Sequence, residues 1–265
     1  MTEKEGRQGR EGLDWCSEWT GATKADIKCK SWNGFINFLH DENALKQKQG
    51  YVFRGHASEK WKLEPTLKRA FSGSTGNQNL NKFKDTTLDS FKKFCLGRRG
   101  HNPPKLSENE WWALGQHYGL NTPLLDWTES PYVAAFFAFN SINHDSKNVV
   151  IWLLSKSINT KPDIDKLKKE NQIEFMTPYL DENSRLINQR GLFIISPSMV
   201  CLNEWTDQII KESTIDLARV LIPVTEKDFA LDSLDKMNVN DLTLFPDLSG
   251  AAKYSNYIAN RTSRK

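Results

Sequence analysis

The chain has 265 residues, a hydrophobic fraction of 38% and nine tryptophans, so it can bury a core without disulfides or metals. Its four cysteines are far apart, no stretch approaches the ~20 apolar residues of a membrane span, and the N-terminus is charged where a signal peptide needs an apolar run. The formal charge of +3 is too mild to indicate nucleic acid by itself. We therefore expect a soluble cytoplasmic protein with no metal site and no membrane partner.

The first expected elements are a leader, a helix and a strand. Residues 1–30 are interpreted as a flexible leader and a short N-terminal extension. Apolar residues from Trp32 to Leu39 follow helical spacing after Ser31, which predicts a capped helix. Tyr51–Arg54 then has the composition of a short strand that ends at Gly55.

Two further helices are predicted before the middle of the chain. The first runs from about Asn79 to Leu96, between a Gly/Ser/Asn loop over residues 72–79 and a break at 97–104. Its expected buried side consists of Phe83, Leu88, Phe91 and Phe94. Ser107 and Glu110 have capping-box spacing, so a second helix begins there and ends near Gly119.

The second half of the chain alternates strands and helices. A strand is predicted at Pro123–Trp127, and Ser130 with Pro131 provides the N-cap and N1 proline of an apolar helix over 132–139. The remaining elements are strands at 149–154, 192–195 and 219–222, and helices at 164–171, after Thr225 and after a cap at Asp247. The class is α+β, with one main domain over 31–255 and a basic tail over 256–265.

The segment Arg54-Gly55-His56 ends an apolar strand. Arg54 can bind a phosphate or carboxylate through two N–H donors, and Gly55 lets backbone and ligand approach closely. The alternative is an arginine paired with an internal acid beside a turn glycine. The tripeptide alone favours the alternative.

A second polar segment surrounds the next strand. Asp126 lies at the carboxyl end of that strand, directly ahead of a capped helix whose N–H groups favour an anion. Asp126 and Ser130 either bind ligand or cap this turn, and His117-Tyr118 has packing as its alternative. The basic pair Arg98-Arg99 and the tail from Arg261 are most simply solvated charge.

Together these segments resemble the FRG domain family, named for the Phe-Arg-Gly tripeptide at 53–55. The resemblance covers roughly residues 30–255 and also includes Gln116–Pro131, Gln189–Phe193 and Leu244–Gly250. FRG domains are in turn similar to the ADP-ribosyltransferase group. That likeness implies a split mixed sheet with flanking helices and NAD as substrate.

The same likeness implies roles for individual residues. Arg54, Asp126 and Gln189 are expected to be catalytic. The expected NAD pocket consists of Arg54, Gly55, His56, His117, Tyr118, Asp126, Trp127, Thr128, Ser130 and Gln189. Many such transferases carry a glutamate in the third motif, where this chain has Gln189-Arg190-Gly191. Because cleavage of the nicotinamide–ribose bond builds positive charge on the ribose, Asp126 is the first substitute carboxylate and Glu129 the second.

The resemblance implies an NAD-dependent mono-ADP-ribosyltransferase acting as a toxin in bacterial antiphage defence. RNA is the first expected acceptor, because arginines and aromatic side chains can hold unstacked bases. A neutralising antitoxin protein is the expected partner. The alternatives are a catalytically silent nucleotide-binding or interaction module, an NAD glycohydrolase, and a protein ADP-ribosyltransferase.

Overall fold

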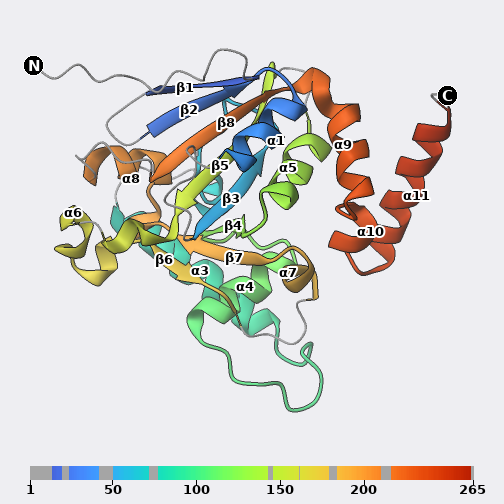
Figure 1. Cartoon of the computed structure of the whole chain (residues 1–265). Coiled ribbons are helices and arrows are strands. Elements are labelled where there is room, and N and C mark those ends of the chain that lie inside the picture. The colour runs from blue at the N-terminus through green and yellow to red at the C-terminus, as the bar shows by residue number, and fades with distance from the viewer. Residues whose placement is uncertain are drawn as a thin grey trace, which may run out of the picture.

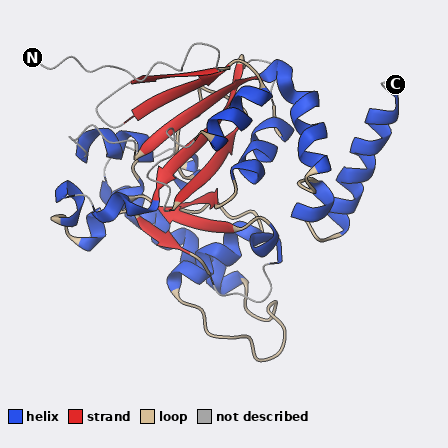
Figure 2. Cartoon of the chain, viewed as in Figure 1, coloured by secondary structure: helices blue, strands red, loops and turns tan. Residues whose placement is uncertain are grey.

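The computed structural model describes residues 14–19, 24–41, 50–71, 77–142, 146–160, 162–178, 184–209 and 216–263. Within them the chain forms a mixed sheet of eight strands in the order β1-β2-β8-β5-β3-β4-β7-β6 (Figure 1). Helices lie on both sides of this sheet (Figure 2). The predicted combination of a mixed sheet with flanking helices is confirmed.

The sheet is mixed because one neighbouring pair, β2 and β8, is parallel while the other pairs are antiparallel. The strands are β1 (Trp15–Trp19), β2 (Lys24–Cys29), β3 (Tyr51–His56), β4 (Leu124–Thr128), β5 (Asn148–Ser155), β6 (Glu174–Met176), β7 (Gly191–Ile195) and β8 (Leu217–Pro223). The α-helices are α1 (Trp32–His40), α2 (Thr66–Ala70), α3 (Asn77–Phe94), α4 (Glu108–His117), α5 (Pro131–Asn140), α6 (Pro162–Asp165), α7 (Ser184–Asn188), α8 (Leu202–Ile209), α9 (Lys227–Lys236), α10 (Asp241–Leu244) and α11 (Leu248–Ser263).

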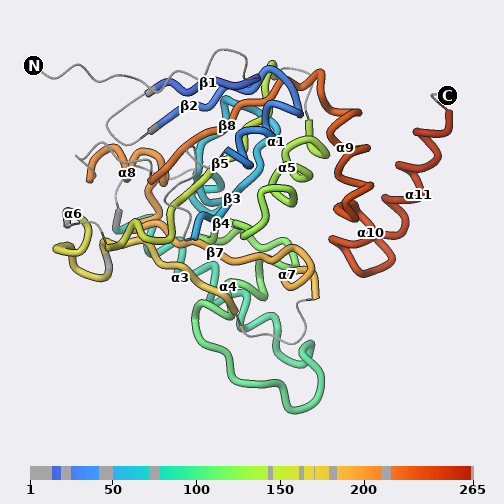
Figure 3. The backbone as a smooth tube through the Cα atoms, viewed as in Figure 1, coloured from blue at the N-terminus to red at the C-terminus, as the bar shows by residue number. Residues whose placement is uncertain are grey.

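The junction between β3 and β4 is the narrowest part of the sheet. These strands are paired through Phe53 and Thr128 alone, whereas β3 pairs with β5 over six residues and β4 with β7 over five. The junction divides the sheet into β1-β2-β8-β5-β3 and β4-β7-β6, which Figure 3 lets the reader follow along the chain. Side chains from both parts can therefore approach one another where the ladder stops.

Helix α5 packs directly on β3, and Gly55 makes this possible. A Cβ atom on Gly55 would lie 1.9 Å from the carbonyl oxygen of Ala134 and 2.8 Å from the nitrogen of Ala138. The glycine is thus required by the close approach of the helix, which differs from the expected approach of a ligand. On the same side of the sheet, Trp32, Phe35 and the α5 side chains form one continuous core.

The predicted helix starts are confirmed by their capping contacts. Ser31 Oγ accepts a hydrogen bond from Gly34 N, and Ser107 and Glu110 form the complete capping box. Pro131 occupies the first turn of α5. Asp247 Oδ1 accepts hydrogen bonds from the backbone nitrogens of residues 249 and 250 at the start of α11. Local polar side chains at these positions therefore determine where the helices begin.

The N-terminal strands β1 and β2 were not predicted. They lie within residues 1–30, interpreted as leader and extension, of which 1–13 lie outside the described residues. The strand β2 extends the main sheet beside β8 and carries the buried Asp26, which pairs with Arg219 of β8. Because a carboxylate at a buried position interrupts the apolar pattern, the sequence does not indicate a strand here.

Several other elements differ from the expectation. The helix α3 begins at Asn77, so the loop predicted over 72–79 ends earlier, and residues 72–76 lie outside the described part. Phe94, expected to be buried, is 65% exposed because it is the last residue of α3. The helix predicted at 164–171 is reduced to α6 and a 3-10 turn at Lys169–Asn171.

At the C-terminus, α11 continues to Ser263 and includes most of the expected basic tail. The strand β6 and the helices α2, α7, α8 and α10 were not predicted, and each of these five has between three and eight residues. No helix in the described part of the chain is both long and apolar enough to cross a bilayer.

Candidate functional site

A pocket of about 380 Å³ lies at the β3–β4 junction. Its volume falls in the range of roughly 300–1,000 Å³ that is usual for small-molecule sites. The lining residues come from both parts of the sheet and from the helices beside them: Phe53, Arg54, Gly55, Ala57, Trp61, Ala113, Gln116, His117, Asp126, Trp127, Thr128, Ala134, Phe137, Ser141, Arg185, Leu186, Gln189, Phe193 and Phe245. The structure thus brings Arg54, Asp126 and Gln189 together.

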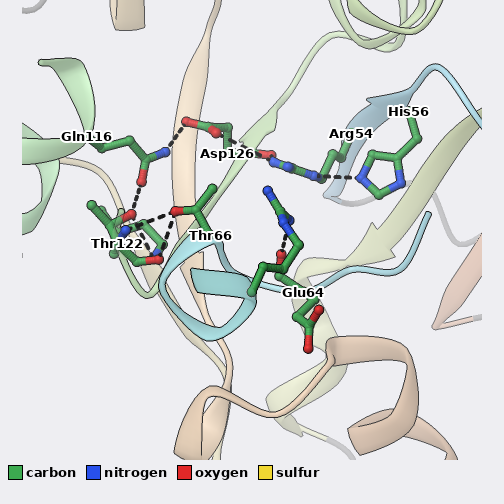
Figure 4. A network of polar contacts seen from close by, with 9 residues as sticks. Arg54, His56, Glu64, Thr66, Gln116, Thr122 and Asp126 are labelled. Carbon is green, nitrogen blue, oxygen red and sulfur yellow. Dashed lines mark hydrogen bonds and ion pairs between the residues drawn. The ribbon is translucent and has the colours of Figure 1, made fainter. Parts of the chain in front are cut away.

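Arg54 is held by one contact within its own strand and one hydrogen bond across the junction (Figure 4). Its Nε donates to His56 Nε2 at 3.1 Å, and its Nη1 donates to the backbone oxygen of Asp126 at 2.5 Å. Nη1 also lies 3.6 Å from the Asp126 carboxylate. Burial lowers the pKa of the guanidinium and the charge of Asp126 opposes that shift. Among the described residues no hydrogen bond uses Nη2, so a charged donor group is left for a ligand.

His56 supports Arg54 from behind the pocket, which it does not line. Its imidazole is buried, and Trp152 Nε1 lies 3.2 Å from its Nδ1. Burial, with the nearby Arg54 charge, lowers the pKa of His56 to about 3, so the ring is neutral at physiological pH. A neutral imidazole has one acceptor nitrogen, so it accepts from Arg54 or from Trp152, but not from both at once.

The Asp126 carboxylate faces the pocket and is 67% exposed. Gln116 Nε2 of α4 donates to Asp126 Oδ1 at 2.5 Å, and Gln116 Oε1 accepts from the Thr122 hydroxyl. The backbone nitrogen of Thr122 in turn donates to Thr66 Oγ1 at 2.9 Å (Figure 4). This chain of contacts fixes the carboxylate relative to Arg54 from the opposite side of the pocket.

Gln116 was not predicted as a site residue, although it opens the polar segment 116–131. Gln116 lies on α4 and Asp126 on β4, so the periodicity of a single helix or strand gives no sign of the contact. The signal that points to it is its position beside His117, which also lines the pocket.

Gln189 lines the pocket but its amide is already engaged. Its side-chain Nε2 donates to the backbone carbonyl of Leu244 at 3.0 Å, and its backbone carbonyl accepts from Thr128 Oγ1 at 2.7 Å. The Ser130 hydroxyl accepts from Val133 N and caps α5, outside the pocket lining. Gln189 therefore ties β4 to the end of α10, and Ser130 follows the capping alternative.

The remaining predicted residues divide between lining and support. Trp127 lines the pocket but is 2% exposed and packs in the core beneath the sheet. Tyr118 lies outside the lining, 71% exposed, edge-on to His117 at 4.9 Å between ring centroids. Glu129, the second candidate carboxylate, also lies outside the lining and pairs with Lys156 and Arg190. Hydrogen bonding by Lys156 lowers its pKa.

An aromatic wall on the far side of the pocket was not predicted. Phe137 of α5 and Phe245, which follows α10, meet edge to face with centroids 6.1 Å apart. The Arg185 guanidinium lies 5.6 Å from the Phe245 ring centroid, and its Nε donates to Asp247 at 2.8 Å. Hydrogen bonds from Ser249 and Arg185 lower the pKa of Asp247. Ion pairing with Asp247 therefore fixes Arg185 beside the Phe245 ring at the pocket.

The pocket can bind an anion beside a planar group. It offers the fixed guanidinium of Arg54, the accessible carboxylate of Asp126 and an aromatic wall, and Arg185 also lines it. Across the described ranges, no three His, Cys, Asp or Glu side chains gather in a way that could hold a metal ion.

Residues 49–147 match the family model of the FRG domain. The matched segment contains Arg54, Gln116, His117 and Asp126, while Gln189 and Phe245 lie beyond it. Neither the curated proteins nor the solved structures include a match to this chain.

Proposed function

We propose that the chain is an NAD-dependent ADP-ribosyltransferase whose NAD site is the pocket at the β3–β4 junction. One observation carries the proposal: the partly buried guanidinium of Arg54 keeps donors available beside the accessible carboxylate of Asp126, 3.6 Å away. The FRG match over residues 49–147 supports it, together with the resemblance expected from the sequence between FRG domains and the ADP-ribosyltransferase group.

Arg54 is the anion-binding residue of this proposal. A guanidinium binds phosphate oxygens through directed N–H groups, and its interaction is strongest where water is excluded. The hydrogen bonds to His56 and to the Asp126 carbonyl hold the side chain in place before a ligand arrives. Neutral His56 performs this role without adding a second positive charge.

Asp126 is the residue proposed to act on the reacting bond. The nicotinamide leaves with the electron pair of its bond to the ribose, and the acceptor forms the new bond to the same carbon and loses a proton. A carboxylate stabilises the positive charge that develops on the ribose. Gln116 keeps the Asp126 carboxylate oriented, and the wall formed by Phe137 and Phe245 offers an apolar contact to the nicotinamide ring.

RNA is the proposed acceptor class, and a bacterial antiphage toxin with a neutralising antitoxin is the proposed setting.

A silent nucleotide-binding module is the second candidate, and one observation favours it. The amide of Gln189, which lies where related transferases carry a glutamate, is committed to the Leu244 carbonyl. Asp126 would then balance the charge of Arg54 without assisting bond cleavage.

A transfer assay separates these candidates. The protein is incubated with NAD labelled in its adenylate phosphate, together with pooled RNA and protein, and label transfer and free ADP-ribose are measured. We expect Asp126→Asn to reduce transfer about 100-fold, the size of effect seen when a group that stabilises the transition state is removed, while NAD affinity changes less than threefold. Asp165→Asn, an exposed aspartate of α6, is the matched control and should retain full activity.

Each alternative has its own result in this assay. NAD binding with no transfer and no hydrolysis would favour the silent module. Free ADP-ribose without any labelled macromolecule would identify a glycohydrolase, and label on protein alone would identify a protein transferase. Undiminished transfer by Asp126→Asn would overturn the role of Asp126.

A further inference from the structure

A strongly basic segment projects from the molecule between α3 and α4, and we call residues 92–105 the basic segment (Figure 1). Between Ser90 and Ser107 the chain has five cationic residues and no Asp or Glu. The cationic residues are Lys92, Lys93, Arg98, Arg99 and Lys105. This concentration contrasts with the nearly balanced charge of the whole chain, 36 basic against 33 acidic residues.

The arginines of the basic segment are fixed by the backbone. Arg98 Nη1 donates to the carbonyl of Phe94 at 2.7 Å, and Arg99 Nη2 donates to the carbonyl of Pro104 at 2.9 Å. The Arg99 guanidinium also lies 4.7 Å from the centroid of the Trp111 ring. In the part of the chain that the structure describes, no carboxylate forms an ion pair with Arg98 or Arg99. Their charge is therefore held in place and left unneutralised.

The nearest acids at the start of α4 have other partners. Glu108 pairs with Lys84 at 3.1 Å, and Glu110 accepts from Ser107 in the capping box. The other basic stretch differs, because Arg261 pairs with Asp232 at 3.2 Å and with Asp235 at 3.3 Å. Among the arginines that the structure describes in these two stretches, Arg98 and Arg99 of the basic segment are the ones without a carboxylate partner.

The basic segment also exposes apolar surface, and the part of α3 just before it packs on α4 beside the pocket. Phe94 and Leu96 are 65% and 75% exposed. The ring of Phe91, one turn before Phe94 on α3, would lie 3.3 Å from a Cβ atom on Gly115 of α4. Gly115 immediately precedes Gln116, which lines the pocket. Helix α3, from which the basic segment continues, therefore packs beside the proposed reaction centre.

We propose that the basic segment binds single-stranded nucleic acid and presents it to the pocket. This inference deepens the proposed transferase function and rests on it for the role as acceptor. Phosphates match the fixed guanidiniums, and exposed Phe94 gives a base a ring to stack on, as in single-strand binding proteins. An acidic protein would satisfy the charges but has no planar bases for Phe94.

Binding is tested without NAD, by fluorescence anisotropy of a labelled single-stranded RNA of 20 nucleotides. The charge variant combines Arg98→Gln, Arg99→Gln and Lys105→Gln. We expect its Kd to rise at least about tenfold, and the slope of log K against log salt to decrease by about 2, as for the loss of three phosphate contacts. The matched control removes the same charge from exposed Lys166, Lys168 and Lys169 and should change Kd less than twofold.

A second variant tests the stacking contact. Phe94→Ala should raise the Kd about tenfold with an unchanged salt slope, because stacking involves no counterion release. Phe94 is mostly exposed, so this variant is expected to fold normally, which thermal unfolding checks.

The outcomes distinguish this inference from the proposed function. Equal weakening by the charge variant and its control would overturn the inference, as would displacement of the RNA by polyglutamate at equal charge concentration, which would indicate an acidic protein partner. If RNA binding persists but no label is transferred, the transferase proposal is wrong and the RNA-binding role of the basic segment stands. Full transfer of label to RNA by the charge variant would show that the basic segment does not present the acceptor, while the transferase proposal would stand.

Discussion

Arg54 and Arg219 lie opposite the same residue of β5, Trp152, on the strands at its two sides. Arg219 forms a two-point ion pair with Asp26, with Nε 2.8 Å from Oδ1 and Nη2 bonded to Oδ2, and the Asp26 side chain is 8% exposed. Arg54 instead bonds to a backbone carbonyl and a neutral imidazole, and its carboxylate neighbour is mostly exposed.

This contrast distinguishes a structural arginine from a ligand-binding one in this sheet. Arg219 and Asp26 neutralise each other inside the protein, which leaves no charge for a third partner. Arg54 lies where the β3–β4 ladder stops, so it faces a pocket and keeps an unused donor group. An arginine paired with an internal acid, the alternative considered for Arg54, thus describes Arg219.

The largest expected effect is on stability, and it separates the two arginines. Arg219→Met leaves the Asp26 carboxylate buried without its partner, so the free energy of unfolding should fall by about 3–5 kcal/mol. Arg54→Met leaves behind an exposed carboxylate, so the change should be about 1 kcal/mol or less. Urea denaturation of both variants measures the difference. Equal losses would mean that Arg54 is structural too.

A smaller effect is expected from the pH dependence of stability. The pKa of His56 is about 3 in the folded protein and about 6.5 in the unfolded chain. Between these values the unfolded chain binds a proton that the folded chain does not, so stability falls as pH falls, by about 1.4 kcal/mol per pH unit.

His56→Gln removes this contribution. Urea denaturation between pH 7 and pH 5 should therefore show a shallower decline for His56→Gln than for the unaltered protein. His101→Gln, at an exposed histidine of the basic segment, is the matched control and should retain the original slope. If His56→Gln declines as steeply as the control, the imidazole behind Arg54 is not held neutral.

Much of the fold follows from local signals in the sequence. Capping residues such as Ser31 and Ser107 determine helix starts through contacts within three residues, so pattern reasoning finds them. Pattern reasoning does not find the strand β2, because Asp26 is buried through its pairing with Arg219, 193 residues away. Burial of a charged residue depends on a tertiary partner that no local window contains.

The candidate site shows the same division. Arg54 and Asp126 were predicted at strand ends and from the family resemblance. Both instead lie inside their strands, β3 and β4, but they do lie together. The role of Gly55 in helix packing, the Gln116 contact to Asp126 and the wall formed by Phe245 all depend on how distant elements approach. The residue types in the sequence identified Arg54 as the anion-binding residue, whereas the groups around it could be identified only from the assembled sheet.

Arg54 is proposed to anchor NAD at the β3–β4 junction, and titration calorimetry with NAD measures its contribution to binding. Arg54→Lys keeps the charge but loses the forked donors, so NAD affinity should fall at least about tenfold, corresponding to about 1.4 kcal/mol. Arg98→Lys, outside the pocket, should leave the affinity unchanged. NAD binding of equal strength in Arg54→Lys and the unaltered protein would contradict the assignment.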